Sequence, residues 1–462
     1  MERMTAQTRL ERLHAPLTYL LRHYPTRVAV TILAAACLVF ALLLRLPAAA
    51  SGPGAATFSD ALFTAVSALS VTGMTVVDPS HWSFFGQVVI LLGMKIGGLG
   101  IMMLAAILSL AVSRRIGLTQ RMLLVSDTKT ERLGEVGSLV KVVIVTTTAL
   151  ELSVAILLFP RFLQLYNRPL EAAWHALFYG VSAFNNAGMV PTDVGLYPYL
   201  NDWFICLPLM LGVFVGALGF PVILNIINTR KKYHHAHKHW SLHTKLTIYT
   251  SAILVLVGFT GFYVLELNNP LTLGELNFSN RVLTALFHAV MPRSAGFNTL
   301  SIDNWHRSTW TLTDALMFIG GGSVSTASGI KVTTLAVIIL AIRAEARGDR
   351  DIEAFGRRIP ASVVRVAVAV VCVGAAVVFL AVIILQEITG SGLDVVLFEA
   401  LSAYATVGLS NGLVRTMPAA GRWVIIALMF IGRTGTMTFA AALAMRDRKR
   451  VIRYPEERPI IG

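Results

Sequence analysis

Long apolar stretches alternate with short polar ones along the 462 residues of the chain. A helix rises about 1.5 Å per residue, so about 20 apolar residues cross the roughly 30 Å hydrocarbon core of a membrane. Eight stretches are long enough to do so. We predict membrane-spanning helices at about residues 28–48, 84–112, 142–160, 203–227, 246–265, 311–342, 363–385 and 423–445.

A short motif recurs four times between the predicted spans. Each copy opens with Leu-Phe, continues through a short apolar segment of helical character and reaches a glycine, and successive glycines are 115, 108 and 112 residues apart. The copies begin at Leu62, Leu177, Leu286 and Leu397, and their glycines are Gly73, Gly188, Gly296 and Gly408. A motif that recurs at a nearly constant interval along the sequence indicates a fold built from repeated structural units. We therefore predict an all-α polytopic membrane protein of four repeats, each a span, a pore helix, a filter loop and a second span, with eight full spans around a pseudo-fourfold pore.

The boundaries of the repeats follow from the spans. We assign the repeats to residues 28–112, 142–228, 245–342 and 362–445, with flanking segments at 1–27 and 446–462. Composition agrees with a membrane protein, because 55% of residues are hydrophobic, 14% are charged and the mean hydropathy is +0.68. Such a chain has too little polar surface for a soluble protein of this size.

The charges predict the topology. The net charge is +14, and 27 of the 39 Lys and Arg residues lie in five polar segments, at 1–27, 113–141, 229–245, 342–361 and 446–462. Basic segments stay on the cytoplasmic side of a membrane. Both termini are therefore expected in the cytoplasm. The alternate connections carry the motifs and Asp60, Asp78, Asp193, Asp202, Asp303 and Asp394, so they are expected to face outward.

The four loops have the chemistry of an ion filter. An ion that enters a membrane must exchange water oxygens for protein oxygens, and rings of backbone carbonyls supply these without formal charge. Glycine allows the backbone angles that such a loop requires. Thr406-Val407-Gly408 is also the tripeptide that opens the potassium-channel filter T-V-G-Y-G. The predicted K⁺-binding filter comprises Val71, Thr72, Gly73, Asn186, Ala187, Gly188, Ser294, Ala295, Gly296, Thr406, Val407 and Gly408. The alternative is four glycine-containing helix turns that only pack together.

A stretch of small residues at 320–334 interrupts the sixth predicted span. Such a stretch should break the helix, and its exposed amides must then meet water or protein at midplane. We expect it to form a movable intramembrane gate, comprising Gly320, Gly321, Gly322, Ser323, Ser325, Thr326, Ser328, Gly329 and Lys331. A small-residue surface for close helix packing is the alternative.

Arg433 is a charge within the eighth predicted span. It follows Trp423 by ten residues, which corresponds to about 15 Å along a helix and places it near the middle of the bilayer. A charge there is costly and normally functional. Arg433 is assigned to the gate, as a donor to the carbonyls of the broken helix, as a barrier to cations, or as both. A purely structural hydrogen bond to neighbouring carbonyls is the alternative.

Other polar groups have simpler explanations. Lys95, Glu151 and Glu266 are explained by snorkelling or mutual pairing at least as well as by transport. The histidine run 234–239 fits a basic loop that touches lipid headgroups or a partner better than a metal site. The chain has no Ser/His/Asp set and no P-loop lysine motif. We therefore expect no enzyme activity and no nucleotide on this chain, with energy supplied by ion gradients.

The chain resembles the Trk/Ktr/HKT superfamily of potassium transporters over almost its whole length, and particularly the membrane subunits of bacterial Ktr systems. Local stretches that carry the resemblance are Ile96 to Gly100, Ser241 to Lys245, Pro292 to Thr299, Phe355 to Pro360, Met429 to Arg433 and the ending around Tyr454 to Glu457. Lys95 departs from it, since a glutamine is more usual there. Val324 and Ala327 also differ, because relatives often have proline or an additional glycine in this loop.

The resemblance implies potassium uptake across a bacterial inner membrane, with Na⁺ as an activating or coupling ion. It also implies an intramembrane gate at 320–334 and a pore-facing Arg433. The implied partners are a second copy in a homodimer and a cytoplasmic RCK-type subunit that binds ATP or ADP. That subunit would contact the cytoplasmic loops and residues 446–462. The competing function is an alternating-access cation symporter, whose repeats are typically two rather than four.

Overall fold

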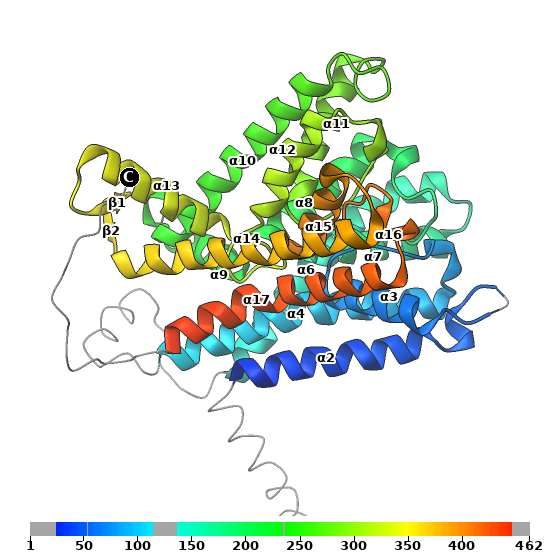
Figure 1. The fold of residues 1–462 in the computed structure, drawn as a ribbon, viewed down its shortest axis with the longest axis horizontal. Coiled ribbons are helices and arrows are strands. Elements are labelled where there is room, and N and C mark those ends of the chain that lie inside the picture. Colours follow the sequence, from blue (N-terminus) through cyan, green and yellow to red (C-terminus); the bar gives the residue numbers. More distant parts are fainter. Residues whose placement is uncertain (1–24, 53, 114–135, 234–235, 446–462) are drawn as a thin grey trace, which may run out of the picture.

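The computed structural model describes residues 25–52, 54–113, 136–233 and 236–445, and almost all of its regular structure is helical (Figure 1). Four sequence-based assignments lie wholly or mostly outside these residues. They are the segments 1–27, 113–141 and 446–462, and the pair His234 and His235.

The helices fall into four successive groups. Each group contains a long first helix, a shorter second helix and a final helix that is continuous or broken. The groups are α2 (Pro25–Leu44), α3 (Phe58–Ser70) and α4 (Phe84–Ser113); α6 (Val136–Leu165), α7 (Pro169–Phe184), α8 (Trp203–Leu218) and α9 (Phe220–Lys232); α10 (Leu242–Glu266), α11 (Phe278–Val290), α12 (Arg307–Phe318) and α13 (Val332–Arg347); and α14 (Ala361–Thr389), α15 (Leu393–Tyr404) and α17 (Ala419–Met445).

Shorter elements connect the long helices. They are η1 (Pro47–Ala49), η2 (Pro79–His81), η3 (Tyr197–Tyr199), η4 (Ala236–His239), η5 (Met291–Arg293), η6 (Ile302–Asn304), α16 (Leu413–Thr416) and the strands β1 (Ile352–Ala354) and β2 (Arg357–Ile359).

The groups contact one another in a regular order. The final helix of each group packs against the short helix of the next: α4 against α7, α8 against α11, and α12 against α15. A fourth contact of the same kind, α17 against α3, joins the fourth group to the first. Figure 1 shows α17 beside α4 and above α2 in this closing contact. The short helices α3, α7, α11 and α15 are therefore each held between two neighbours.

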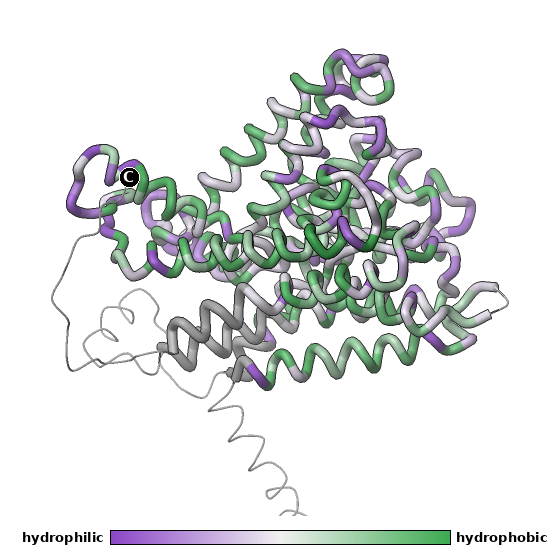
Figure 2. The backbone as a smooth tube through the Cα atoms, viewed as in Figure 1, coloured by the Kyte–Doolittle hydropathy of each residue, from purple (hydrophilic) through white to green (hydrophobic). Residues whose placement is uncertain are grey.

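Several helices have the length and apolarity of membrane spans. Among the described residues, four meet both criteria, within α2, α6, α10 and α14, and the bent pair α8 and α9 meets them together. Figure 2 shows α2 and α14 as mainly hydrophobic, whereas hydrophilic residues gather in the connections and in the β1–β2 hairpin. The prediction of eight full spans remains a prediction.

The predicted continuous helix at 203–227 is wrong. Its axis bends by 95° between α8 and α9. The cause is local, because Gly219 has φ +92 and Pro221 follows it. A left-handed residue ends the hydrogen-bond ladder and proline suits the first turn of a new helix. The sequence signal was Gly219-Phe220-Pro221.

The predicted break at 320–334 exists, but its bounds differ. The helix α12 ends at Phe318 and α13 begins at Val332. Residues 319–331 therefore form the non-helical segment, which we call the broken-helix loop. Thr333 and Thr334 belong to the first turn of α13, where β-branched residues already have helical angles.

The description as all-α omitted one hairpin. The strands β1 and β2 pair antiparallel, with Ala354 opposite Arg357. Phe355 and Gly356 connect them with φ of +52 and +72. Two consecutive positive φ values are typical of the tight two-residue turn whose twist suits paired strands.

Gly219→Ala is expected to destabilise the protein. Its added Cβ would lie 2.6 Å from the carbonyl oxygen of Ser323, and the positive φ alone costs about 1–2 kcal/mol for a residue with a Cβ. Gly412→Ala is the matched control, since Gly412 has φ +87 and nothing within 4 Å of the Cβ position. In thermal unfolding of the detergent-solubilised protein, Gly219→Ala should have the lower midpoint. Equal midpoints would contradict a contribution from the contact with Ser323.

Candidate functional site

Four loops with the same backbone pattern follow the four short helices. In each loop, two residues with positive φ are separated by one residue without it. The pairs are Val71 (+57) and Gly73 (+91), Asn186 (+60) and Gly188 (+64), Ser294 (+128) and Gly296 (+59), and Thr406 (+50) and Gly408 (+94). A side chain at positive φ is strained, and such strain persists where surrounding structure enforces it. The pattern turns successive carbonyls in a way that a continuing helix does not allow.

The four glycines of these loops meet one another's loops in a closed ring. A Cβ on Gly73 would overlap the carbonyl oxygen of Ala187, and one on Gly188 would overlap that of Ala295. In the same way, Gly296 faces the carbonyl of Val407, and Gly408 faces the carbonyl of Thr72, which returns to the first loop. All twelve residues assigned to the filter therefore belong to loops that lie together. No side chain fits at any of the four glycines.

Serines anchor three of the loops, and sequence reasoning missed them. Ser67 Oγ accepts from the Gly73 amide at 3.1 Å and donates to the Met74 carbonyl at 2.7 Å. Ser402 Oγ accepts from the Gly408 amide at 3.1 Å. Ser182 donates to the carbonyl of Met189 at 2.8 Å. The signal was present, because the repeated motif contains Val-Ser-Ala or Leu-Ser-Ala in these three copies.

The third loop is held differently. Met291 replaces the serine, and its carbonyl accepts from the amide of Ala295 at 3.0 Å. Arg293 is buried and donates to the carbonyl and hydroxyl oxygens of Ser251, at 3.1 and 3.0 Å. The four loops thus share one backbone path while their anchors differ.

A buried ion pair supports the second loop. Lys95 in α4 pairs with Glu151 in α6, whose side chain is 1% exposed. The other carboxylate oxygen of Glu151 accepts from Asn185 Nδ2 at 2.8 Å, and Asn185 directly precedes Asn186 of the second glycine loop. The mutual pairing proposed for Lys95 and Glu151 is confirmed. Glu266 instead accepts from neutral donors, including Asn269 at 2.6 Å.

The broken-helix loop packs against the bend between α8 and α9. The amide of Gly322 donates to Ala217 O at 2.7 Å, and the amide of Phe220 donates to Val324 O at 3.2 Å. Each break therefore satisfies polar backbone groups that the other leaves free, which buried backbone requires. Within the loop, Gly320 N donates to Ile330 O at 2.9 Å.

The broken-helix loop also reaches the filter loops. Ser328 N lies 3.4 Å from Ser294 Oγ, and Thr326 Oγ1 lies 3.3 Å from the carbonyl of Phe184 at the end of α7. Lys331 Nζ donates to Ala327 O at 2.7 Å, within the loop itself.

Arg433 joins the loop to two long helices. Its side chain, from α17, donates to the carbonyl of Thr326, to Ser328 Oγ at 3.2 Å and to the Gly97 carbonyl of α4 at 3.0 Å. The residue is 2% exposed. The expected hydrogen bonds from Arg433 to carbonyls of the broken helix are therefore present.

The histidine run offers no metal site in the part that is described. Residues 236–239 form η4, and His239 stacks on Tyr233 with ring centroids 3.9 Å apart. Among the described residues there is no group of three His, Cys, Asp or Glu side chains that would suit a metal ion.

Comparison with known proteins identifies the family. The sequence model of the TrkH family, described as cation transport protein, matches residues 17–451. The chain belongs to the TrkH family of cation transport proteins. It is therefore a multi-pass membrane transporter rather than an enzyme.

Individual TrkH-family relatives extend this result. The chain is 36% identical to Ktr system potassium uptake protein B of Bacillus subtilis, over 92% of this chain and 94% of that protein. It is 35% identical to Ktr system potassium uptake protein B of Vibrio alginolyticus, over 91% of each chain. It is 32% identical to potassium/sodium uptake protein NtpJ of Enterococcus hirae, over 91% of this chain and 93% of that protein.

A solved structure matches the fold. The potassium transporter TrkH from Vibrio parahaemolyticus superposes with a TM-score of 0.71 at 18% identity, over 92% of this chain and 86% of that one. This similarity identifies the fold alone. The bend at Gly219 and the broken-helix loop therefore occur within a transporter fold.

Lys95→Met is expected to lower both stability and ion preference. It leaves the carboxylate of Glu151 buried without its cation, which costs up to about 3–5 kcal/mol, and it loosens the support of Asn185. The double variant Lys95→Met with Glu151→Gln should recover most of the stability. Thermal unfolding and the ratio of K⁺ to Na⁺ uptake are the measurements.

Arg161→Met is the control for this pair. Arg161 lies in α6, as Glu151 does, and forms an ion pair with Asp202 at 2.6 Å. Within the described part of the chain, this ion pair has no hydrogen bond to any of the four glycine loops. Its removal should leave the uptake ratio unchanged. If Lys95→Met behaves like Arg161→Met in that ratio, the ion pair has no role in shaping the second loop.

Proposed function

We propose that this protein takes up potassium through the ring of four glycine loops. The closed contact from Gly73 to Ala187, and onward through the other three loops back to Thr72, is the observation that carries the proposal. It brings backbone carbonyls from all four loops together. Carbonyl oxygens can replace the hydration shell of K⁺. The printed names of the B. subtilis and V. alginolyticus relatives agree with this cargo.

The proposal includes the architecture around the ring. Four repeats form a pseudo-fourfold pore with eight full spans, and the packing of each final helix on the next short helix supports this arrangement. The basic segments and both termini lie in the cytoplasm, as the distribution of Lys and Arg favours. The protein resides in the inner membrane of a bacterial cell.

The broken-helix loop is the proposed gate. It contacts the filter loops through Ser328 and Thr326, and Arg433 ties it to α4 and α17. A loop held by side-chain hydrogen bonds opens when those bonds break. The positive φ of Val324, +58, adds backbone strain within the same loop.

Sodium and partner proteins complete the proposal. Na⁺ acts as an activating or coupling ion, which agrees with the printed name of the E. hirae relative. The protein forms a homodimer and binds a cytoplasmic RCK-type subunit. ATP or ADP binds to that subunit and not to this chain. The family resemblance supports these partners.

Replacing the ring glycines is the test of the filter. Gly73→Ser, Gly188→Ser, Gly296→Ser and Gly408→Ser should each raise the apparent KM for K⁺ or reduce its preference over Na⁺. A change of about tenfold corresponds to about 1.4 kcal/mol. The measurement is K⁺ and Na⁺ uptake into cells that lack their own potassium uptake systems, normalised to the amount of protein in the membrane.

Gly390→Ser is the matched control for these variants. Gly390 has φ +65, close to the +64 of Gly188, but nothing lies within 4 Å of its Cβ position. It should keep normal ion preference. If all four ring variants also keep it, the loops form no filter, and an alternating-access cation symporter becomes the better account.

Arg433→Met is expected to increase the rate of K⁺ uptake without changing the preference for K⁺. It removes two hydrogen bonds to the broken-helix loop, at Thr326 and Ser328, and one to Gly97 of α4, so the loop should leave the path more often. Arg422→Met is the control, because Arg422 lies on the same helix but bonds Asp60 at 3.0 Å. Lower K⁺ preference in Arg433→Met at an unchanged rate would assign the arginine to the filter instead.

A further inference from the structure

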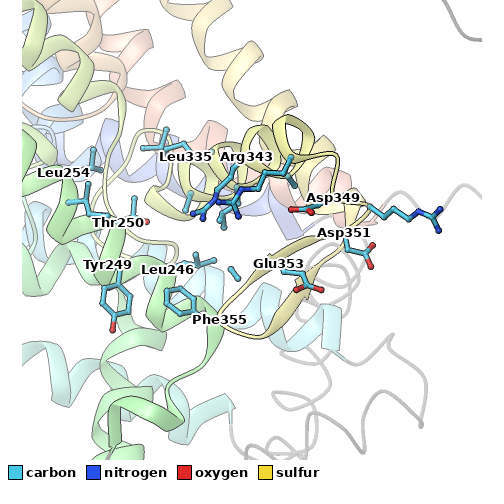
Figure 3. Close-up of a pocket in the computed structure, with 18 residues that line it drawn as sticks. Leu246, Tyr249, Thr250, Leu254, Leu335, Arg343, Asp349, Asp351, Glu353 and Phe355 are labelled. Carbon is cyan, nitrogen blue, oxygen red and sulfur yellow. The ribbon is translucent and has the colours of Figure 1, made fainter.

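A cavity of about 890 Å³ lies away from the ring, between α10, α13 and the β1–β2 hairpin (Figure 3). Its inner wall is apolar and includes Leu246, Leu254 and Leu335. Figure 3 shows Tyr249 and Phe355 on one side of the cavity, with Leu335 and Arg343 on the opposite side. The proposed ion path and gate use none of these residues, although the lining residues from Arg343 to Phe355 belong to the basic segment 342–361.

Two aromatic rings form one wall of the cavity. Tyr249 from α10 stacks on Phe355 from the hairpin turn, with ring centroids 5.4 Å apart and planes 20° apart. Lys245 Nζ lies 5.7 Å from the centroid of the Phe355 ring. Amphipathic aromatic side chains gather where hydrocarbon meets water. Of the two rings, Tyr249 is amphipathic in this sense, whereas Phe355 adds apolar surface to the same wall.

Arginines form the polar rim. Arg343 and Arg347 are four residues apart in α13, so their side chains lie on one face, and Arg350 follows the helix. No carboxylate among the described residues forms a salt bridge with Arg343 or Arg347.

Acidic side chains are present in the lining as well. They are Asp349, Asp351 and Glu353, and Asp351 is already paired with Arg358 at 2.8 Å. The two arginines of α13 therefore lie above an apolar cavity with no anion from the described part of the chain to bind them.

Two of the side chains that line the cavity are apolar and exposed. Ile253 of α10 is 60% exposed and Ile339 of α13 is 53% exposed. Exposed apolar side chains on spanning helices face lipid tails or another protein.

We propose that this cavity is a binding site for an anionic phospholipid. One acyl chain lies against Leu254, Leu335 and Ile339, and the phosphate lies between Arg343 and Arg347. Basic pockets between spanning helices at the cytoplasmic interface bind anionic headgroups in this way. The site does not depend on the ion path, and its test measures binding rather than transport.

The test uses the full-length protein purified in detergent, wild type and Arg343→Gln with Arg347→Gln. Added phosphatidylglycerol should raise the thermal unfolding midpoint of the wild type, whereas phosphatidylcholine and inorganic phosphate should not. Loss of both arginines should weaken the phosphatidylglycerol effect by up to about thirtyfold in concentration, since each basic group near a lipid surface contributes about fivefold. Native mass spectrometry should detect the bound lipid on the wild type and not on the variant.

Arg230→Gln with Lys231→Gln is the matched control. It also removes two exposed positive charges at the end of a helix, but this helix is α9, and neither residue lines the cavity. It should respond to phosphatidylglycerol as the wild type does. Equal losses in both double variants would mean general surface attraction and would overturn the site. An unchanged response to phosphatidylglycerol in Arg343→Gln with Arg347→Gln would also overturn the site. If that variant alone shifted from dimer to monomer, the cavity would instead be assigned to a second copy.

Discussion

The close approach of glycine to carbonyl is the constraint on which the rest of this structure depends. At four points a backbone passes so near the carbonyl of the next loop that no Cβ fits, at Gly73, Gly188, Gly296 and Gly408. Because each contact joins consecutive loops and the fourth returns to the first, the positions of the short helices are coupled. A change in one loop must be accommodated by its neighbours.

Backbone hydrogen bonding explains why two helices break rather than one. An unpaired amide or carbonyl is costly where water is scarce. The loop between α12 and α13 leaves such groups free, and the bend at Gly219 supplies partners for two of them through Ala217 and Phe220. Arg433 adds donors to the carbonyl of Thr326. The loop, the bend and the arginine therefore form one hydrogen-bonded unit.

The four loops share a backbone path but differ in their supports. Serine holds the first, second and fourth loops, whereas Arg293 and the Met291 carbonyl hold the third. The second loop alone adjoins the ion pair of Lys95 and Glu151 through Asn185. The ring therefore repeats one backbone geometry on four different sets of supporting side chains. The asymmetry also provides separate places at which a mutation alters one loop.

The sequence by itself determined the apolar helices, the fourfold motif and the ring glycines, because period, apolarity and the need for glycine are properties of short segments. It also located the break near Gly320 and the unusual charge of Arg433. Only the tertiary structure decided that the broken-helix loop pairs with the bend at Gly219, that the four glycine loops close into a ring, and which carbonyls Arg433 contacts. These depend on residues far apart in the chain, such as Arg433 and Gly97, which are 336 positions apart. Local patterns specify which groups need a partner, and packing alone selects it.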